Sequence, residues 1–313
     1  MDAGNDRTVQ GSEKRGIGLS GRRRLVCAGL PTDVASRPQD GLSSDTEWRA
    51  TLHRSFAAEW EILAAHCPDG KVERHRGMTV VRTGLPSAFF NRGFALDPPE
   101  DAGGAIDRIR SVMDPGETPW SLVTTTESLP GWDRAISALQ LKHLETVPGM
   151  VWDVTRVATL ECPRELEIHA ISRPEEARTF WRIDAEGTGL PPGFWTPLAE
   201  RLATERAGAW HPLTMYLGIV GGRPVCITMR IDSDGIGGIY AVVTLPEFRR
   251  KGYGAAITAA AALDGKKAGS TLSYLQSSAM GRPVYESLGY RLVEEYQFWV
   301  PKRFFPKDSP PSE

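Results

Sequence analysis

From residue 45 onward, the chain alternates between two spacings of hydrophobic residues. Residues 46–65 carry large apolar side chains three or four positions apart behind a Ser-Ser-Asp sequence, which predicts an amphipathic helix. Similar spacing predicts helices over 98–113, 132–141, 174–186, 194–207, 252–268 and 282–287. Short β-branched and aromatic runs predict strands over 78–83, 89–96, 120–125, 150–154, 166–171, 214–220, 224–231, 236–243, 271–276 and 291–300. The predicted fold class is α/β with a mixed sheet.

The predicted elements follow a similar order in two halves of the chain. Leu141 and Leu288 are 147 residues apart (288 − 141), and so are Trp152 and Trp299 (299 − 152). Few other identities match at this offset, so chance remains open, but the shared element order favours a duplicated fold. We predict an amino-terminal domain at 46–160 and a carboxy-terminal domain at 161–313. Residues 1–45 lack periodic apolar positions and predict a disordered tail.

Composition narrows the possible functions of this chain. Its 313 residues suggest about two domains. The 37 basic and 39 acidic residues give a net charge of −2, which does not favour nucleic acid as a partner. No apolar run is long enough to cross a bilayer, so we expect no membrane partner. The four cysteines are far apart, which argues against a disulfide framework or a zinc site and favours the cytoplasm.

The most specific chemical signal lies at residues 239–254. A strand runs into Pro246, and Arg249-x-x-Gly252-x-Gly254 then opens an alanine-rich helix. Glycines allow close approach to the backbone, and free N–H groups at a helix N-terminus bind phosphate. Three basic residues add positive charge beside the glycines, namely Arg249, Arg250 and Lys251. The segment matches neither the three-glycine dinucleotide fingerprint nor the P-loop, so it predicts a pyrophosphate site of another kind.

Two segments resemble the motifs of one family. The sequence VTLPEFRRKGYGAA resembles the cofactor-binding motif of the GCN5-related N-acetyltransferases (GNAT). Downstream, YLQSSAMGRPVYESLGYRLVEEY resembles the closing motif of that family. The two segments span 239–300, and the element order extends the resemblance back to about residue 165. The resemblance implies a tandem GNAT-like acyl-CoA N-acyltransferase fold, acetyl-CoA as co-substrate and no metal.

The resemblance also implies roles for single residues. Backbone groups at the end of the strand would line the pantetheine arm of acetyl-CoA: Val242, Val243 and Thr244. Loop and helix N–H groups would bind its pyrophosphate: Arg250, Lys251, Gly252, Tyr253, Gly254 and Ala255. Arg249 either contacts phosphate or packs locally. Ser278 would bond the pantetheine or a water, and Tyr285 either protonates the departing thiolate or is a half-buried aromatic of its helix.

The sequence leaves two parts of the site unassigned, namely the general base and the acceptor pocket. Many family members carry glutamate on the strand before the glycine loop, but residues 239–243 contain no carboxylate, so the general base is unassigned. Residues around the predicted helices 174–186 and 194–207 form either an acidic, aromatic pocket for a cationic amine or core aromatics beside a solvated loop. These residues are Trp181, Asp184, Glu186, Phe194, Trp195 and Trp210.

The prediction for function is transfer of an acetyl group from acetyl-CoA to the primary amine of a small molecule, by direct attack in a ternary complex. The alternatives are a protein or peptide N-acetyltransferase and an acyl-CoA-binding regulatory protein without turnover. The amino-terminal half has no glycine loop, and the 147 offset places Ala138 opposite Tyr285 (285 − 147). That half is predicted to have lost its cofactor site. The expected state is a monomer or a homodimer.

Overall fold

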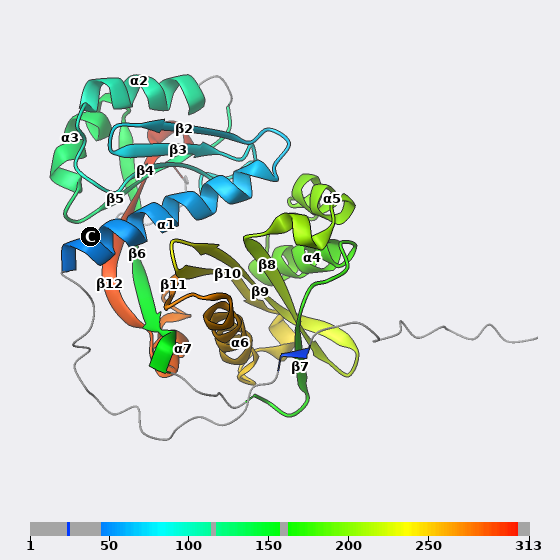
Figure 1. Cartoon of the computed structure of the whole chain (residues 1–313). Helices are drawn as coiled ribbons and strands as arrows, with labels where there is room; N and C mark the ends of the chain where they lie inside the picture. The colour runs from blue at the N-terminus through cyan, green and yellow to red at the C-terminus, as the bar shows by residue number, and fades with distance from the viewer. Residues whose placement is uncertain (1–23, 26–44, 114–116, 157–161, 306–313) are drawn as a thin grey trace, which may run out of the picture.

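The computed structural model describes residues 24–25, 45–113, 117–156 and 162–305 (Figure 1). Of the predicted tail, Arg24–Leu25 forms a short strand, β1, that pairs with residues 168 and 169. Residue 45 begins the first helix. The rest of the predicted tail, and the predicted domain boundary at 160 and 161, lie outside the described residues.

Seven consecutive elements occur in the same order in each half of the molecule. The amino-terminal half, residues 45–156, contains α1 (Asp45–Ala65), β2 (Lys71–His75), β3 (Met78–Arg82), β4 (Asn91–Ala95), α2 (Ala102–Met113), β5 (Ser121–Thr125), α3 (Leu129–Ala138) and β6 (Leu141–Asp153). The carboxy-terminal half, residues 162–305, contains β7 (Leu166–Ala170), α4 (Glu176–Thr188), α5 (Thr196–Thr204), β8 (Leu213–Val220), β9 (Arg223–Ser233), β10 (Ile236–Thr244), α6 (Tyr253–Ala268), β11 (Leu272–Gln276), α7 (Arg282–Leu288) and β12 (Arg291–Pro301). The run from β2 to β6 therefore repeats as β8 to β12.

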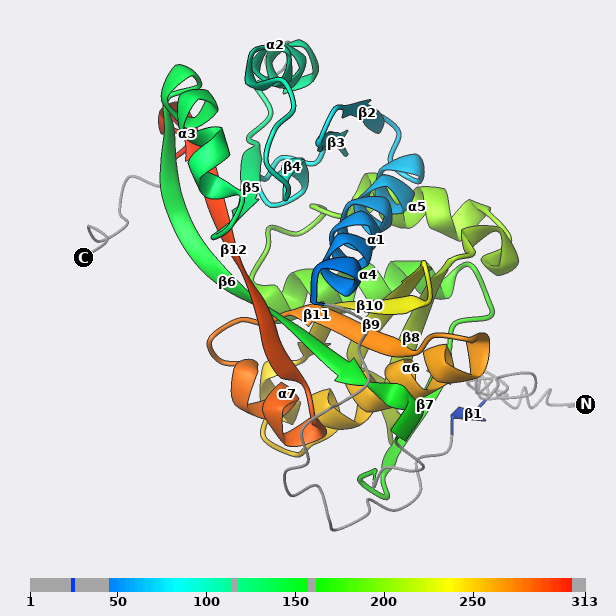
Figure 2. The ribbon, with the colours of Figure 1, turned by 60° about the vertical axis from the view of Figure 1, so that its left-hand side comes forward.

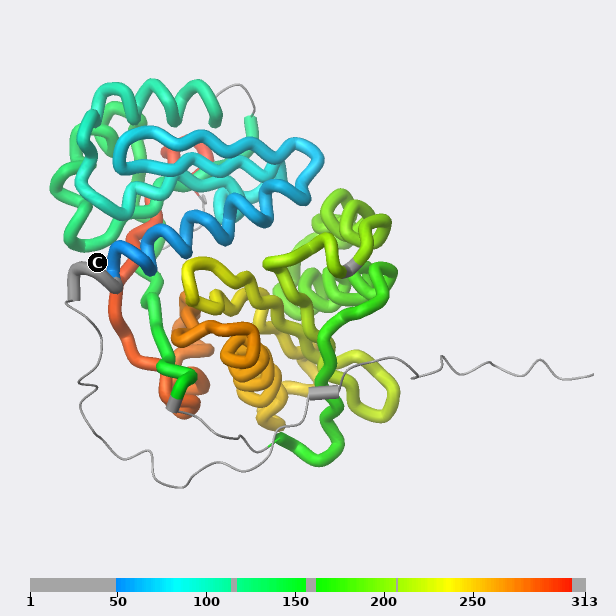
Figure 3. The backbone as a smooth tube through the Cα atoms, viewed as in Figure 1, coloured from blue at the N-terminus to red at the C-terminus, as the bar shows by residue number. Residues whose placement is uncertain are grey.

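The two halves share one mixed sheet because they exchange their last strands. The strand order is β1-β7-β8-β9-β10-β11-β6-β12-β5-β4-β3-β2. Strand β6 lies between β11 and β12, and β12 lies between β6 and β5, so each half completes the sheet of the other. Figure 2 shows the long antiparallel pair of β6 and β12 joining the halves, and the crossing can be followed along the tube in Figure 3.

Strand register shows that Trp152 and Trp299 occupy equivalent positions in the two halves. Trp299 pairs with Leu122, which in turn pairs with Gly93 of β4. In the other half, Trp152 pairs with Ser273, which in turn pairs with Gly237 of β10. Each tryptophan thus begins the same three-strand ladder ending on a glycine. The duplication is a property of the fold, whatever the low number of sequence identities.

Helices cover both faces of the sheet and enclose three clusters of buried side chains. Helices α1, α4 and α5 pack on one face over a core that contains Phe56, Phe180 and Tyr274. On the opposite face, α6 covers a core in the carboxy-terminal half, and α2 and α3 cover another in the amino-terminal half. The first core draws residues from both halves, so α1 contributes to the packing of the carboxy-terminal half as well as its own.

The structure differs from the predicted elements at four places in the amino-terminal half. The strand predicted over 150–154 is the end of β6, which begins at Leu141. Strand β2 was absent from the prediction because its sequence, KVERH, has one apolar residue and is mostly exposed. The helix predicted over 98–113 begins at Ala102, after Asp101. The helix predicted over 132–141 ends at Ala138, and Gln140 takes a positive φ of 51° before β6 begins at Leu141.

One cysteine takes part in a disulfide, although the sequence argued against a disulfide framework. Cys162 is disulfide-bonded, whereas Cys67 and Cys226 are free and buried. Burial raises the pKa of both free thiols to about 12. Within the described ranges, no helix has the length and hydropathy of a membrane span. The same residues contain no cluster of three or more metal-ligating side chains.

Candidate functional site

Strand β10 pairs with its neighbour β11 over only the first third of its length. The two strands pair in parallel only over Ile236–Gly238. On its other edge β10 stays with β9, but the register shifts between Tyr240 and Val243, and Ala241 takes a positive φ of 50°. A bulge of this kind bends a strand and increases its twist. The predicted pantetheine-lining residues therefore lie on the part of β10 that has turned away from β11: Val242, Val243 and Thr244.

The loop after β10 is held in place by Arg249. Its Nε donates a hydrogen bond to the carbonyl oxygen of Thr244 at 3.1 Å, and its Nη2 donates one to the carbonyl oxygen of Gly187 at 2.7 Å. The same guanidinium thus joins the end of β10 to the last turn of α4. Gly187 allows this approach, since a Cβ there would overlap the side chain of Val243. In this structure the side chain of Arg249 serves the local packing of the loop.

The start of α6 presents backbone amides without a side-chain cap. Gly252, the N-cap residue, has a φ of 79°, and Arg250 also takes a left-handed φ of 61°. The amide of Ala256, bonded to the carbonyl oxygen of Gly252 at 3.0 Å, makes the first intrahelical bond, and no side chain caps the amides before it. Such amides, at the positive end of the helix dipole, form a site for phosphate. The side chains of Arg250 and Lys251 are exposed beside them.

Tyr253 anchors this end of the helix to the rest of the half. Its ring is buried, and its hydroxyl donates a hydrogen bond of 2.8 Å to Glu165 just before β7. Gly254 has no side chain, and a Cβ there would approach Thr244 Oγ1 to 3.6 Å. The backbone of the first turn is therefore fixed while its amides stay open, as a phosphate cradle requires.

Tyr285 of α7 lies on the same face of the sheet as α6. It packs against the core beneath that helix, with its ring 5.9 Å from the ring of Tyr290. Burial raises the pKa of Tyr285 to about 12, so its hydroxyl remains protonated at neutral pH. Ser278 is exposed at the preceding turn, where its Oγ accepts a hydrogen bond of 3.1 Å from the amide of Gly281. A Cβ on Gly281 would crowd the Tyr285 ring, so this glycine sets the position of the phenol.

One carboxylate near β10 was not predicted as a site residue. Glu59 of α1 is fully buried, and its Oε2 accepts a hydrogen bond from the hydroxyl of Tyr240. Burial, with a smaller contribution from Asp232, raises the pKa of Glu59 well above its ordinary value. A signal was present in the sequence, since Glu59 falls at helical spacing from Phe56 and Leu63 in the apolar stripe of α1.

The helices α4 and α5 contain the residues of the predicted acceptor pocket. A cavity of about 480 Å³ lies between these helices, lined in part by Trp181 and Trp195. Asp184 does not line it: its carboxylate accepts a hydrogen bond of 2.6 Å from the indole of Trp195, and burial raises its pKa to about 6. Glu186 pairs with Arg182 at 3.2 Å. The tryptophans are core side chains, so most of the features that suggested an acidic pocket serve packing.

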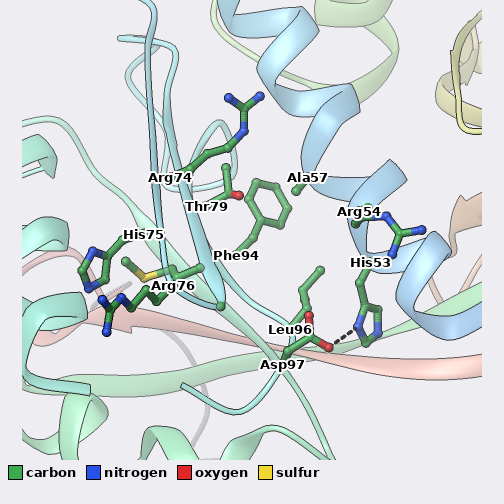
Figure 4. Close-up of a pocket in the computed structure, with 12 residues that line it drawn as sticks. His53, Arg54, Ala57, Arg74, His75, Arg76, Thr79, Phe94, Leu96 and Asp97 are labelled. Atoms are coloured by element: carbon green, nitrogen blue, oxygen red, sulfur yellow. Dashed lines mark hydrogen bonds and ion pairs between the residues drawn. The ribbon is translucent and has the colours of Figure 1, made fainter. Parts of the chain in front are cut away.

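A second cavity, of about 360 Å³, lies in the amino-terminal half between α1 and the hairpin of β2 and β3 (Figure 4). The His53 Nδ1 and an oxygen of Asp97 are 3.1 Å apart at its base. Although burial opposes the charged imidazole, the carboxylates of Asp97 and Glu294 raise the pKa of His53. Arg74 at the rim pairs with Glu61. His53 and Arg74 thus have carboxylate partners, and neither the glycine loop nor Tyr285 lines the cavity.

Comparison with known proteins bears on the fold. Residues 216–300 match the model of the family described as FR47-like protein. The structure resembles a GCN5-related N-acetyltransferase from Kribbella flavida, with a TM-score of 0.62 and 17% identity over 84% of this chain and 97% of that one. It also resembles a GCN5-related N-acetyltransferase from Sphaerobacter thermophilus, with a TM-score of 0.52 and 14% identity over 74% of this chain and 75% of that one.

A conserved protein of unknown function from Staphylococcus epidermidis is similar too, with a TM-score of 0.51 and 14% identity over 74% of this chain and 94% of that one. No curated protein matches the chain. Fold and site thus define a mixed α/β protein with the GNAT fold. The fold that the two motifs implied is confirmed, since two of the similar structures are GCN5-related N-acetyltransferases.

Proposed function

We propose that the carboxy-terminal half transfers the acetyl group of acetyl-CoA to the primary amine of a small molecule. The observation that carries this proposal is the conjunction of an uncapped helix N-terminus at Gly252 with a strand that bends away from its neighbour after Gly238. The first feature suits a pyrophosphate, and the second provides a wedge for the pantetheine arm. Tyr285 on the same face adds a proton donor.

Binding of acetyl-CoA rests on main-chain groups in this proposal. The amides of Gly252 to Ala255 bind the pyrophosphate, and Arg250 and Lys251 add positive charge at the rim. The backbone of Val242 to Thr244 pairs with the amides of pantetheine as a further strand would. Arg249 holds the loop before α6 against the end of β10 and the last turn of α4. Its guanidinium bonds the carbonyl oxygen of Thr244 on β10 and that of Gly187 on α4.

The chemistry follows from the substrate thioester and these side chains. The amine nitrogen attacks the carbonyl carbon, forming the C–N bond, and the C–S bond then breaks. The leaving thiolate takes the hydroxyl proton of Tyr285, which recovers a proton lost by the nitrogen. The raised pKa keeps Tyr285 protonated until the thiolate forms. Direct attack is favoured over an acyl-enzyme because Cys226, a free cysteine of the neighbouring strand β9, is not available as a nucleophile. Its side chain is fully buried, and its pKa of about 12 keeps the thiol protonated.

The packing of α1 favours a small acceptor over a protein chain. Helix α1 lies on the face of the sheet formed by β9 and β10, where Ser55 Oγ donates a hydrogen bond of 3.0 Å to the carbonyl oxygen of Ser233. An extended peptide laid along β10 on that face would have to displace α1. A small amine reaching the end of the wedge would not.

Acetyl-CoA turnover with a panel of primary amines tests the proposal. Thiol release is measured for amino acids, polyamines, arylalkylamines and aminoglycosides, and mass spectrometry identifies the product. The proposal expects release above the rate of acetyl-CoA hydrolysis for at least one amine, with a mass gain of one acetyl group on the amine. Calorimetric binding of acetyl-CoA without turnover would support a regulatory protein instead, and absence of binding would overturn both.

A further inference from the structure

Helix α1 runs along β10 although it belongs to the other half. Near the start of the strand, Ser55 bonds Ser233 and the Nε of Arg54 lies 3.9 Å from Asp234. Further along, the ring of Trp60 lies 6.4 Å from the ring of Tyr240. Residue 59 therefore lies over the middle of β10, where the strand stops pairing with β11.

The carboxylate of Glu59 occupies the side-chain position of Gly238. A Cβ built on Gly238 would overlap the Glu59 carboxylate, and the backbone of this glycine is not in the left-handed region. Glycine is thus required here by space and not by φ. Gly238 is the last residue of β10 that pairs with β11, so the carboxylate lies at the point where the wedge begins.

This carboxylate is only half satisfied within the described part of the chain. Tyr240 bonds Oε2, whereas Oε1 has no hydrogen-bond partner there although it is fully buried. A buried, unpartnered carboxylate oxygen is costly unless a proton or a cation reaches it. The groups that face it are Asp232 of β9, Tyr240 of β10, Tyr274 of β11 and Tyr296 of β12, none of which is a cation.

We infer that Glu59 is the proton acceptor of the acyl-transfer site, supplied by the amino-terminal half in place of a side chain on β10. This inference rests on the proposed function. The acceptor enters as an ammonium ion, and one N–H proton passes to Glu59 Oε1, which leaves a neutral amine with a free electron pair. The amine then attacks the thioester carbon. Glu59 later releases its proton to solvent, so the net products are the amide, CoA thiol and one proton.

The environment of Glu59 suits this role. The raised pKa of Glu59 lies closer to the pKa of an ammonium group than the pKa of an ordinary carboxyl does. Transfer of a proton from the ammonium to Glu59 is therefore less unfavourable. The hydroxyl of Tyr240 holds Oε2, so it fixes which oxygen is left to accept a proton. Tyr240 is therefore a positioning residue, and Glu59 is the group that reacts.

The first test replaces Glu59 with the isosteric amide. Glu59→Gln keeps an oxygen for Tyr240 but cannot accept the proton. We expect kcat/KM to fall by about 100-fold, and the rise of kcat/KM on the acidic side of the pH profile to disappear. Calorimetric affinity for acetyl-CoA should not change. Glu61→Gln on the same helix, which removes the pairing with Arg74 on the rim, is the matched control and should retain the wild-type profile.

The second test moves the carboxylate to β10. In Glu59→Ala/Gly238→Asp, the aspartate enters the volume that Glu59 vacates, so we expect at least one tenth of wild-type kcat/KM and a restored acidic limb. Glu59→Ala/Gly238→Ala, which fills the same space without a carboxylate, should stay as inactive as Glu59→Gln. A merely structural role for Glu59 would give these two double variants equal activity.

The outcomes separate the two proposals. If the wild-type protein turns over and Glu59→Gln keeps both its rate and its acidic limb, the assignment of Glu59 is wrong and the proposed function stands. Equal activity of the two double variants would overturn the assignment in the same way. If the wild-type protein acetylates no amine of the panel, the proposed function fails and the role of Glu59 with it.

Discussion

The crossover from β4 to α2 and the crossover from β10 to α6 are equivalent in the duplicated fold, but they differ in the two features on which the proposed acetyl-CoA site rests: strand separation and an uncapped helix N-terminus. Strands β4 and β5 pair through Ala95, and the Ser128 Oγ donates a hydrogen bond of 2.7 Å to the carbonyl oxygen of Ala95. Strands β10 and β11 separate after Gly238. The first crossover closes the gap between its strands, and the second opens it.

The N-termini of α2 and α6 also differ, since one is capped by a side chain and the other is not. At α2, the Oδ1 of Asp101 accepts a hydrogen bond of 3.0 Å from the amide of Gly104, and this bond lowers the pKa of Asp101. A carboxylate of the chain thus occupies the place where a phosphate would bind. At α6, Gly252 offers no side chain. One fold carries a closed and an open version of the same crossover, so the proposed acetyl-CoA site depends on local capping and strand pairing and not on topology.

The largest effect should come from giving α6 a carboxylate cap like the one that Asp101 provides for α2. Gly252→Asp places a carboxylate at the N-cap, where it competes for the amides of the first turn and repels phosphate. We expect the calorimetric Kd for acetyl-CoA to rise by at least about 100-fold. Gly252→Asn, which caps without charge, should weaken binding less. Equal affinity of Gly252→Asp and wild type would contradict the location of the pyrophosphate site.

Removing the phenol of α7 should affect turnover and not binding. In Tyr285→Phe, the thiolate loses its proton donor, so kcat should fall by about 100-fold while the Kd for acetyl-CoA stays constant. The 147-residue offset places Ala138, the last residue of α3, opposite Tyr285, and Ala138→Tyr should leave both quantities unchanged. Full turnover of Tyr285→Phe in steady-state kinetics would remove Tyr285 from the mechanism.

A smaller effect is expected from weakening the hydrogen bonds of Ser128 that hold β4 and β5 together. Ser128→Ala deletes the hydrogen bond to Ala95 and leaves the buried amide of Thr125 without the Oγ that it now contacts at 3.0 Å. Loss of a buried partner costs about 1–3 kcal/mol, which denaturant unfolding measures. The variant should gain no affinity for acetyl-CoA, because Asp101 still caps α2. Unchanged stability would show that these bonds do not hold the strands together.

The smallest effect concerns Asp184, a carboxylate on helix α4. The pKa of Asp184 is raised to about 6, so the folded state disfavours its ionised form; this destabilisation is absent below about pH 4 and complete above about pH 6. Asp184→Asn should therefore stabilise the protein by about 1–2 kcal/mol at pH 7.5 and not at pH 4. Unlike Glu59→Gln, it should leave the acidic limb of kcat/KM intact. Equal gains at both pH values in thermal unfolding would contradict this reading.

The sequence predicted the second half of the molecule better than the first. The elements around the glycine loop followed from apolar spacing and from glycines at positive φ, as at Gly252. In the amino-terminal half, the start of α2 depended on the capping bond of Asp101, and β2 lacks the apolar alternation that identifies a strand. Both are tertiary or local hydrogen-bonding effects that hydrophobic spacing does not report.

The exchange of strands and the position of Glu59 were beyond the reach of sequence motifs. The equality of the Leu141–Leu288 and Trp152–Trp299 offsets indicated duplication, but pairing partners depend on the whole sheet. Glu59 lies 179 residues before Gly238 (238 − 59), so no local pattern joins them. Only the packing of α1 across both halves brings this carboxylate to the wedge.

Hydrogen–deuterium exchange with and without saturating acetyl-CoA tests the central claim most directly, because one experiment reads both crossovers. The account predicts slower exchange at the amides of residues 250–255 and along β10 after Gly238, with no change at residues 101–104. Protection at the start of α2, or equal protection of the two helix ends, would contradict the claim that only the carboxy-terminal half keeps an open nucleotide site.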